Sequence, residues 1–165
     1  MDWKAISDRI LDGGQITEAE ALAVLESSDD ELLEVLQAAY RVRKKYFGKT
    51  VALHLLQNVK SGKCPEDCTF CSQSTRAMND VERYDMQTVE TIVAGAQAAA
   101  DRNAKRYCMV SSTRAPSPNE LDVICEATIQ IKQKYPNLEI CSSLGLLNEE
   151  KALKLKDAGV DRFNH

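Results

Sequence analysis

Three cysteines in one short stretch have the spacing of a metal-cluster loop. Cys64, Cys68 and Cys71 follow the pattern C-x3-C-x2-C. Three thiolates from one tight loop can hold three irons of a cubane 4Fe-4S cluster, whereas electron-transfer ferredoxins close the cluster with a fourth cysteine. No fourth cysteine lies near these three. The pattern therefore predicts a cluster in which one iron has no protein ligand.

An iron without a protein ligand can bind a reactant directly. It can chelate the amino and carboxylate groups of S-adenosylmethionine and pass an electron into the sulfonium, which releases a 5′-deoxyadenosyl radical.

A zinc site is the alternative to the cluster. Structural zinc takes four ligands, often as two separated pairs, and neither His54 nor His165 completes a recognised zinc pattern with the cysteines. The spacing therefore favours the cluster over zinc or free thiols.

Two further cysteines occupy equivalent places in consecutive predicted strands. Cys108 lies in residues 106–111 and Cys141 lies in residues 138–144. Side chains alternate across a strand. If the strand neighbours of the two cysteines, such as Tyr107, Met109 and Ile140, pack under helices, both thiols therefore point to the opposite face. Adjacent parallel strands lie about 5 Å apart, so the pair could hold neighbouring positions of one 2Fe-2S cluster. Free cysteine is also a common small core residue, and from spacing alone core packing is favoured for this pair and for Cys125.

The segments that must position the cysteines alternate between strand and helix after residue 48. The apolar run 51–56 is typical of a strand that is covered on both faces, and it leads into the cysteine loop. Periodicity and capping residues predict strands over 51–56, 106–111, 138–144 and 160–164, and helices over 88–103, 117–135 and 148–159. Strands separated by single helices imply a parallel sheet. We therefore expect an α/β fold, a (βα) barrel of TIM type, with the cysteine loop at the carboxyl ends of the strands.

The first part of the chain has a different pattern. Residues 1–47 have helical periodicity, and Thr17 with Glu20 forms a capping box. Breaks at residues 13–14 and 27–28 divide this region into about three helices. We expect residues 1–47 to be a helical extension and residues 48–165 to be the first part of the barrel. Since the sequence ends in a fourth strand, whose edge would be uncovered, we expect an amino-terminal fragment of a longer protein.

Composition excludes several classes of function. The chain has 165 residues and a net charge of -4, with acidic and basic residues interspersed, which argues against nucleic-acid binding and against a polybasic membrane patch. The chain contains no run of about 18 apolar residues, the length that a membrane span needs. Its first residues lack the basic-then-apolar layout of a secretory signal. Six cysteines in such a chain indicate metal ligands or core thiols rather than disulfides. We expect a cytoplasmic protein.

The cysteine loop resembles that of a known family. The stretch 58–74, NVKSGKCPEDCTFCSQS, is similar to the cluster loop of the biotin synthases in the radical-SAM superfamily. Three later segments resemble the same family in order and spacing: RYCMV at 106–110, ICSSLG at 140–145 and AGVDRFNH at 158–165. The resemblance covers essentially the whole chain. A bare C-x3-C-x2-C motif indicates only the superfamily, but the ending of the loop together with two strand cysteines is much more specific.

The resemblance implies an activity and its cofactors. Biotin synthases insert sulfur between two unactivated carbons of dethiobiotin, in a (βα)8 barrel that is commonly a homodimer. The expected cofactors are a 4Fe-4S cluster, S-adenosylmethionine and a 2Fe-2S cluster that donates the sulfur. The expected partners are dethiobiotin and an electron donor such as flavodoxin or ferredoxin.

The resemblance also implies roles for individual residues. Cys64, Cys68 and Cys71 would ligate the 4Fe-4S cluster, and Cys108 and Cys141 would be two ligands of the 2Fe-2S cluster. This reverses the assignment that spacing alone favours for the strand pair. The other implied contacts are Phe70 beside the adenine of S-adenosylmethionine, the backbone of Ser111 at its methionyl end, and Asn164 near the ureido ring of the substrate. Phe70 could equally be plain loop packing.

The sequence departs from the family pattern in one respect. The 2Fe-2S cluster of the family also needs a third cysteine and an arginine from later strands, and these residues lie beyond the 165 present. We therefore expect this piece alone to be inactive. Two alternatives stay open: a relative of the same barrel group without the second cluster, such as a maturase or a methylornithine-type mutase, and a non-catalytic iron–sulfur or zinc binding module.

Overall fold

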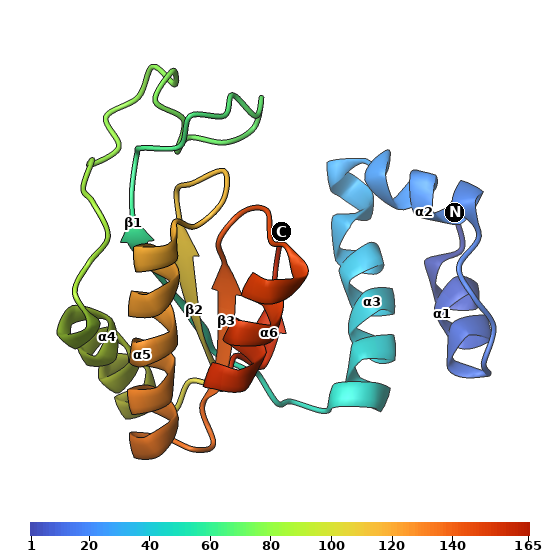
Figure 1. Ribbon diagram of the computed structural model, residues 1–165. Coiled ribbons are helices and arrows are strands. Elements are labelled where there is room, and N and C mark those ends of the chain that lie inside the picture. Colours follow the sequence, from blue (N-terminus) through green and yellow to red (C-terminus); the bar gives the residue numbers. More distant parts are fainter. The chain divides into compact units, whose positions relative to one another are not determined.

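The computed structural model describes residues 1–165, which divide into two units, Met1–Val51 and Ala52–His165. Three α-helices build the first unit: α1 (Trp3–Leu11), α2 (Glu18–Leu25) and α3 (Leu32–Phe47), with a short 3-10 turn at Asp29–Glu31 before α3 (Figure 1). The predicted capping box opens α2, because the Thr17 side chain accepts a hydrogen bond from the Glu20 amide and the Glu20 carboxylate accepts one from Thr17. The three helices expected from the sequence are therefore present.

The second unit contains a four-stranded sheet. Its strands are β1 (His54–Lys60), β2 (Arg106–Ser111), β3 (Glu139–Ser143) and β4 (Arg162–Phe163), and the intervening helices are α4 (Val89–Asp101), α5 (Pro118–Lys134) and α6 (Glu149–Ala158). The strands follow the order β1-β2-β3-β4, and every neighbouring pair is parallel. The alternation of strand and helix predicted from the sequence is therefore confirmed.

The helices begin and end where capping residues stand. Thr88, Ser117 and Asn148 each accept a hydrogen bond from a backbone amide in the first turn of α4, α5 and α6. Ser117 is followed by a first-turn proline and forms a capping box with Glu120. Gly159 ends α6 with a φ of 102°, a left-handed conformation that favours glycine.

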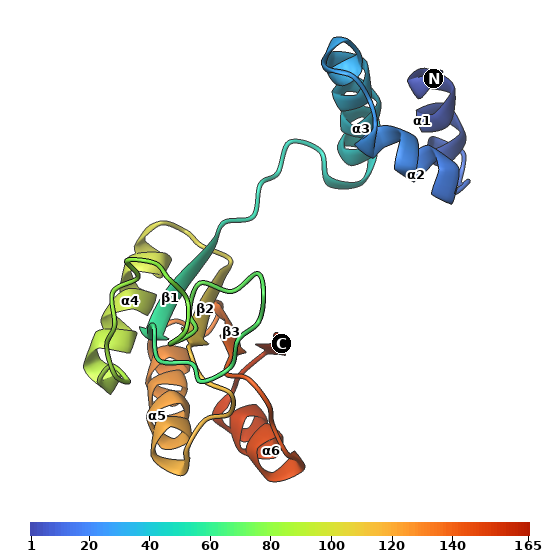
Figure 2. The same cartoon turned by 90° about the horizontal axis from the view of Figure 1, so that it is seen from above.

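Helices α4, α5 and α6 cover one face of the sheet (Figures 1 and 2). The strand residues that point toward them are buried, and they include Tyr107, Met109 and Ile140. Residues of the opposite face differ in burial: Leu56 is exposed, Cys108 is half-buried and Cys141 is buried. The sheet therefore has a covered face, which carries the core, and an open face, which carries the two strand cysteines. None of the helices is both long and apolar enough to cross a membrane.

The expected bounds and covering of the first strand were wrong. The apolar run 51–56 predicted a strand with both faces covered, but β1 begins at His54 and continues to Lys60. Val51 and Leu53 lie before the strand and are exposed, and Leu56 is 64% exposed because it points to the face without helices. The strand instead buries Val59, together with half-buried Leu55 and Gln57, against the helices.

One glycine allows α4 to pack closely on the sheet. A Cβ at Gly95 would lie 1.6 Å from Gln57 Oε1 and 2.8 Å from Tyr107 Oη, where the Tyr107 hydroxyl donates to Gln57. We expect Gly95→Ala to lower the free energy of unfolding by about 1–3 kcal/mol, because the strain exceeds the gain in helix propensity. Urea denaturation measures this, with Ala94→Ser on the exposed side of the same helix as the control. A more stable Gly95→Ala variant would contradict the packing described.

Candidate functional site

The cysteine loop begins at the carboxyl end of β1 (Figure 1). A short parallel bridge between Cys64 and Ser74 closes its base. The Cys64 amide donates to the Gln73 carbonyl over 3.2 Å, and the Thr75 amide donates to the Cys64 carbonyl over 2.9 Å. The first cysteine therefore stands where the loop leaves the sheet, as the sequence predicts.

The three loop cysteines differ in exposure. Cys64 and Cys71 are half-buried near the base, whereas Cys68 is exposed at the tip. A hydrogen bond of 3.0 Å from the Cys71 amide to the Cys68 carbonyl folds the chain between the last two. The structure thus places all three in one loop, but it does not gather three or more His, Cys, Asp or Glu side chains into a group that could hold a metal ion.

The donor set fits an iron–sulfur cluster better than the zinc alternative. The loop offers three free thiols and no imidazole. His54 lies at the opposite end of β1 from the loop, so it cannot complete a four-ligand zinc site there. Soft thiolates are the ligands that iron–sulfur clusters prefer.

Cys108 and Cys141 lie side by side on the open face of the sheet. They are register partners across β2 and β3, and neither forms a disulfide. Burial, together with the neighbouring thiol of Cys141, raises the pKa of Cys108 to about 11, and nearby Arg106 acts in the opposite direction. The raised pKa disfavours a free thiolate at Cys108. Binding to a metal or cluster removes the thiol proton, and two adjacent thiols can both serve as ligands.

An ion pair lies two residues before the cysteine pair, on the same face of the sheet, and the sequence did not predict it. Arg106 and Glu139 are register partners, and Arg106 Nη2 lies 2.6 Å from Glu139 Oε2. Arg162, the partner of Cys141 in β4, lies 3.6 Å from the same carboxylate oxygen. The hydrogen bond from Arg106 lowers the pKa of Glu139. The available signal was position: Arg106 and Glu139 each precede a strand cysteine by two residues and so share its face.

The other three predicted site residues lie at the carboxyl ends of strands or, for Phe70, in the loop that follows such an end. Phe70 is 94% exposed in the cysteine loop. Ser111 ends β2, where its carbonyl accepts a hydrogen bond of 3.0 Å from the Thr113 amide and its buried hydroxyl has no partner. Asn164 follows β4 directly, and its backbone amide donates a hydrogen bond of 2.9 Å to the Ser142 carbonyl. These residues come from three strand ends of one edge, and their roles stay predictions.

Cys125 belongs to the core. It is buried in α5, and its thiol donates weakly to the Lys154 carbonyl at 3.8 Å. Burial raises its pKa, so it is a poor thiolate. The sequence predicted this packing role.

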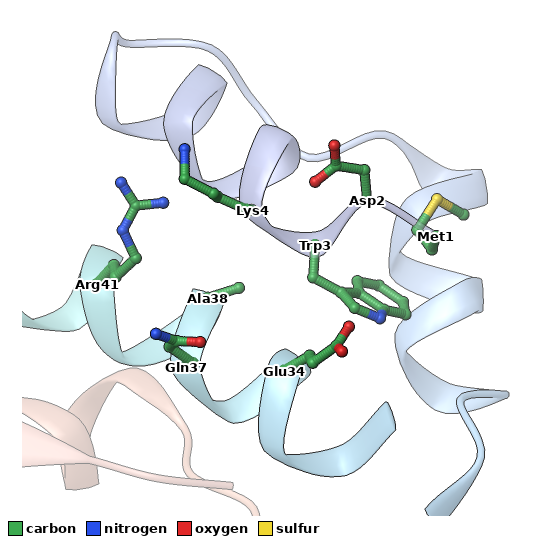
Figure 3. A pocket seen from close by; sticks show the side chains of 8 residues that line it. All are labelled: Met1, Asp2, Trp3, Lys4, Glu34, Gln37, Ala38 and Arg41. Atoms are coloured by element: carbon green, nitrogen blue, oxygen red, sulfur yellow. The ribbon is translucent and has the colours of Figure 1, made fainter. Parts of the chain in front are cut away.

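A cavity in the first unit carries no comparable chemistry (Figure 3). It has a volume of about 600 Å³ and is lined by Met1, Asp2, Trp3, Lys4, Glu34, Gln37, Ala38 and Arg41. Its two cations are already paired within the protein. Lys4 lies 2.7 Å from Asp8, and Arg41 contacts both Asp8 and the Ser7 hydroxyl. We therefore assign the cavity to the packing of α1 on α3.

A family comparison places the chain in a known class. The model of the radical SAM superfamily matches residues 58–165, which include the cysteine loop and all four strand ends. The chain belongs to the radical SAM superfamily, whose members use a 4Fe-4S cluster and S-adenosylmethionine.

The curated relatives are more specific. The chain is 51% identical over 163 residues to the biotin synthase of Salinibacter ruber, with 99% of this chain and 45% of the relative covered. It is 48% identical over 165 residues to the biotin synthase of Anoxybacillus flavithermus, with 100% and 50% covered. The chain therefore spans about half the length of the curated relatives that it matches, and the resemblance drawn from the sequence is confirmed.

Two solved structures share the fold. Methylornithine synthase matches with a TM-score of 0.77 at 23% identity, covering 95% of this chain and 45% of that one. A maturase of the FeFe-hydrogenase matches with a TM-score of 0.69 at 18% identity, covering 96% and 35%. These structures confirm the α/β class and the likeness to part of a radical-SAM barrel, and at this identity they indicate the fold alone.

Proposed function

We propose that these residues form the amino-terminal half of a biotin synthase, which inserts sulfur into dethiobiotin. The observation that carries this proposal is the Cys108–Cys141 pair on the open face of a sheet that also carries the cysteine loop. A radical source alone needs only the loop. A second thiol pair supports a second cluster, and the identity of 44–51% to biotin synthases supports the same reading.

In this proposal Cys64, Cys68 and Cys71 hold a 4Fe-4S cluster, and Cys108 and Cys141 supply two ligands of a 2Fe-2S cluster. When bound, the clusters supply the electron that cleaves S-adenosylmethionine and the sulfur atom that enters the product. The protein positions these groups and keeps water out, as proteins do for other demanding cofactors.

The chain's own residues carry that positioning task. The loop base fixes Cys64 against the carboxyl edge of the sheet. The parallel ladder of β2 and β3 holds Cys108 beside Cys141. We assign the adenine contact to the exposed ring of Phe70, a backbone contact with the methionyl group to Ser111, and a contact with the ureido ring to Asn164, whose amide can both donate and accept hydrogen bonds.

The complete protein would need more than these residues. By the resemblance to biotin synthases, the proposed 2Fe-2S cluster also takes a third cysteine and an arginine from strands later than β4. We therefore propose that this half alone does not form biotin, and that the complete protein acts as a homodimer with a flavodoxin- or ferredoxin-type electron donor. Residues 1–47 would be a helical extension to the barrel that begins at residue 48.

A radical-SAM enzyme with one cluster is the second candidate, because the superfamily match rests on a region whose cysteine loop alone can serve as a radical source. Such an enzyme has no use for Cys108 and Cys141 as ligands. The chain is 23% identical to the methylornithine synthase structure but 51% identical to the first biotin synthase compared, so we favour biotin synthesis.

The proposal is tested by anaerobic reconstitution of the complete protein with iron and sulfide. S-adenosylmethionine, dethiobiotin and reduced flavodoxin are then added, and mass spectrometry follows biotin and 5′-deoxyadenosine. We expect both products, and neither without S-adenosylmethionine. If the protein loaded with both clusters releases 5′-deoxyadenosine but forms no biotin, the proposal of a biotin synthase is wrong.

A further inference from the structure

One side chain, that of Gln73, makes two hydrogen bonds across the base of the cysteine loop. The Gln73 Oε1 atom accepts a hydrogen bond of 2.8 Å from the Gly62 amide and one of 3.0 Å from the Ser61 hydroxyl. The Gln73 carbonyl accepts a third bond, from the Cys64 amide. A single residue after the last cysteine is thus bonded to three residues at or before the first cysteine.

The surroundings of this contact are buried, whereas the loop tip is not. Ser61, Gly62 and Ser74 are buried, and residues 65–70 are exposed. The tip has two contacts of its own. One is the backbone hydrogen bond from Cys71 to Cys68, and the other is an exposed ion pair of 3.4 Å between Glu66 and Arg114. Exposed ion pairs contribute little stability. The location of the thiols relative to the sheet is therefore set at the base.

Two other contacts fasten the same base to the sheet. Ser61 pairs with Tyr84 through two backbone hydrogen bonds of 3.2 Å. The Ser112 hydroxyl, just after β2, accepts a bond of 3.1 Å from the Lys63 amide. These contacts hold the entry of the loop, but neither reaches its exit. The Gln73 side chain joins the exit to the entry, alongside the backbone bond from the Thr75 amide to the Cys64 carbonyl.

We propose that Gln73 is a positioning residue that closes the cysteine loop before any cluster is bound. Gly62 and Ser61 are both donors at this point, so the site needs one acceptor that can take two bonds. An amide oxygen has two lone pairs and meets that need without a charge. Removing it leaves a buried amide without its acceptor, which is costly. The role of the loop as a cluster site rests on the function proposed above, but its closure by Gln73 does not.

The test compares three variants of the complete protein. Gln73→Met keeps the length of the side chain and removes the acceptor, and Gln73→Glu restores an acceptor for both donors. Gln87→Met is the matched control, because Gln87 is another partly buried glutamine whose Oε1 accepts a bond, from Gln57, within the same unit. Hydrogen exchange of the cluster-free protein and the rate of 4Fe-4S formation at limiting iron are measured for each.

We expect Gln73→Met to speed exchange at the Gly62 amide by about ten-fold or more and to slow cluster formation, while the thermal midpoint stays near that of the Gln87→Met control. Gln73→Glu should recover most of both losses. Unchanged exchange in Gln73→Met, or a Gln87→Met control that changes the loop equally, would overturn the proposal. If Gln73→Met does not fold, Ser61→Ala must speed exchange at the loop base, and a failure to do so overturns the proposal as well.

The two proposals fail in distinguishable ways. If the parent protein forms no cubane cluster at all, the proposed function is wrong, yet the exchange measurement still decides whether Gln73 closes the loop. If the parent forms the cluster and Gln73→Met exchanges normally, only the role of Gln73 is wrong.

Discussion

Cys68→Ala is expected to reduce the 4Fe-4S signal of the reconstituted protein to below about a tenth of the parent level, because a ligand that must bind as thiolate is lost. Cys68 is the most exposed of the three loop cysteines, so the substitution removes a thiol without opening a core cavity. Cleavage of S-adenosylmethionine should fall with the cluster. Mössbauer or EPR spectroscopy measures the first effect, and release of 5′-deoxyadenosine measures the second.

Cys125→Ala is the matched control for that experiment. Cys125 is also a free cysteine, but it is buried in α5 and lies outside both proposed sites. Its replacement should leave the cubane signal unchanged. A Cys68→Ala protein with a parent-like spectrum would show that the loop does not ligate the cluster as proposed.

Cys108→Ala and Cys141→Ala are each expected to abolish biotin formation in the complete protein while most S-adenosylmethionine cleavage remains. The two thiols are assigned to the sulfur donor, not to the radical source, so the two activities should separate. Loss of a ligand should cost at least the ~10- to 100-fold that removal of an outer-shell partner typically costs. Biotin and 5′-deoxyadenosine are measured in the same reactions.

Each variant can give a clear contrary result. Normal biotin formation by Cys108→Ala or Cys141→Ala would remove that residue from the sulfur-donor site. Loss of S-adenosylmethionine cleavage to the same extent as biotin formation would mean that the pair supports the radical source or the fold instead. The Ser143→Ala variant, on the same strand face as Cys141, controls for general effects on β3.

Elements with strong local signals could be predicted closely from the sequence. The bounds of β2 agree with the predicted 106–111, and half-buried and buried positions alternate along it. Thr88, Ser117 and Asn148 cap their helices as their residue types suggest. The first strand was misplaced because an apolar run does not show which of its residues lie in the link that precedes the strand.

The candidate site was only partly predictable for a different reason. The three loop cysteines lie within a few residues of one another, so the sequence shows their spacing directly. The Arg106–Glu139 pair and the contacts of Gln73 depend on register and on the path of the loop backbone. Such contacts join segments that are not adjacent in sequence, so no local pattern marks them.

The two thiol groups differ in how much of the chain must fold before they meet. Cys64, Cys68 and Cys71 share one loop, whose base closes through contacts between its own two ends, such as the Gly62–Gln73 bond with a sequence separation of 11. Cys108 and Cys141 meet only after α5 has packed and the β2–β3 ladder has formed. Closing the longer segment costs more chain entropy and makes it the slower step. During synthesis, the loop should therefore become competent to accept iron before the strand pair does, and this order would fill the radical-generating site first.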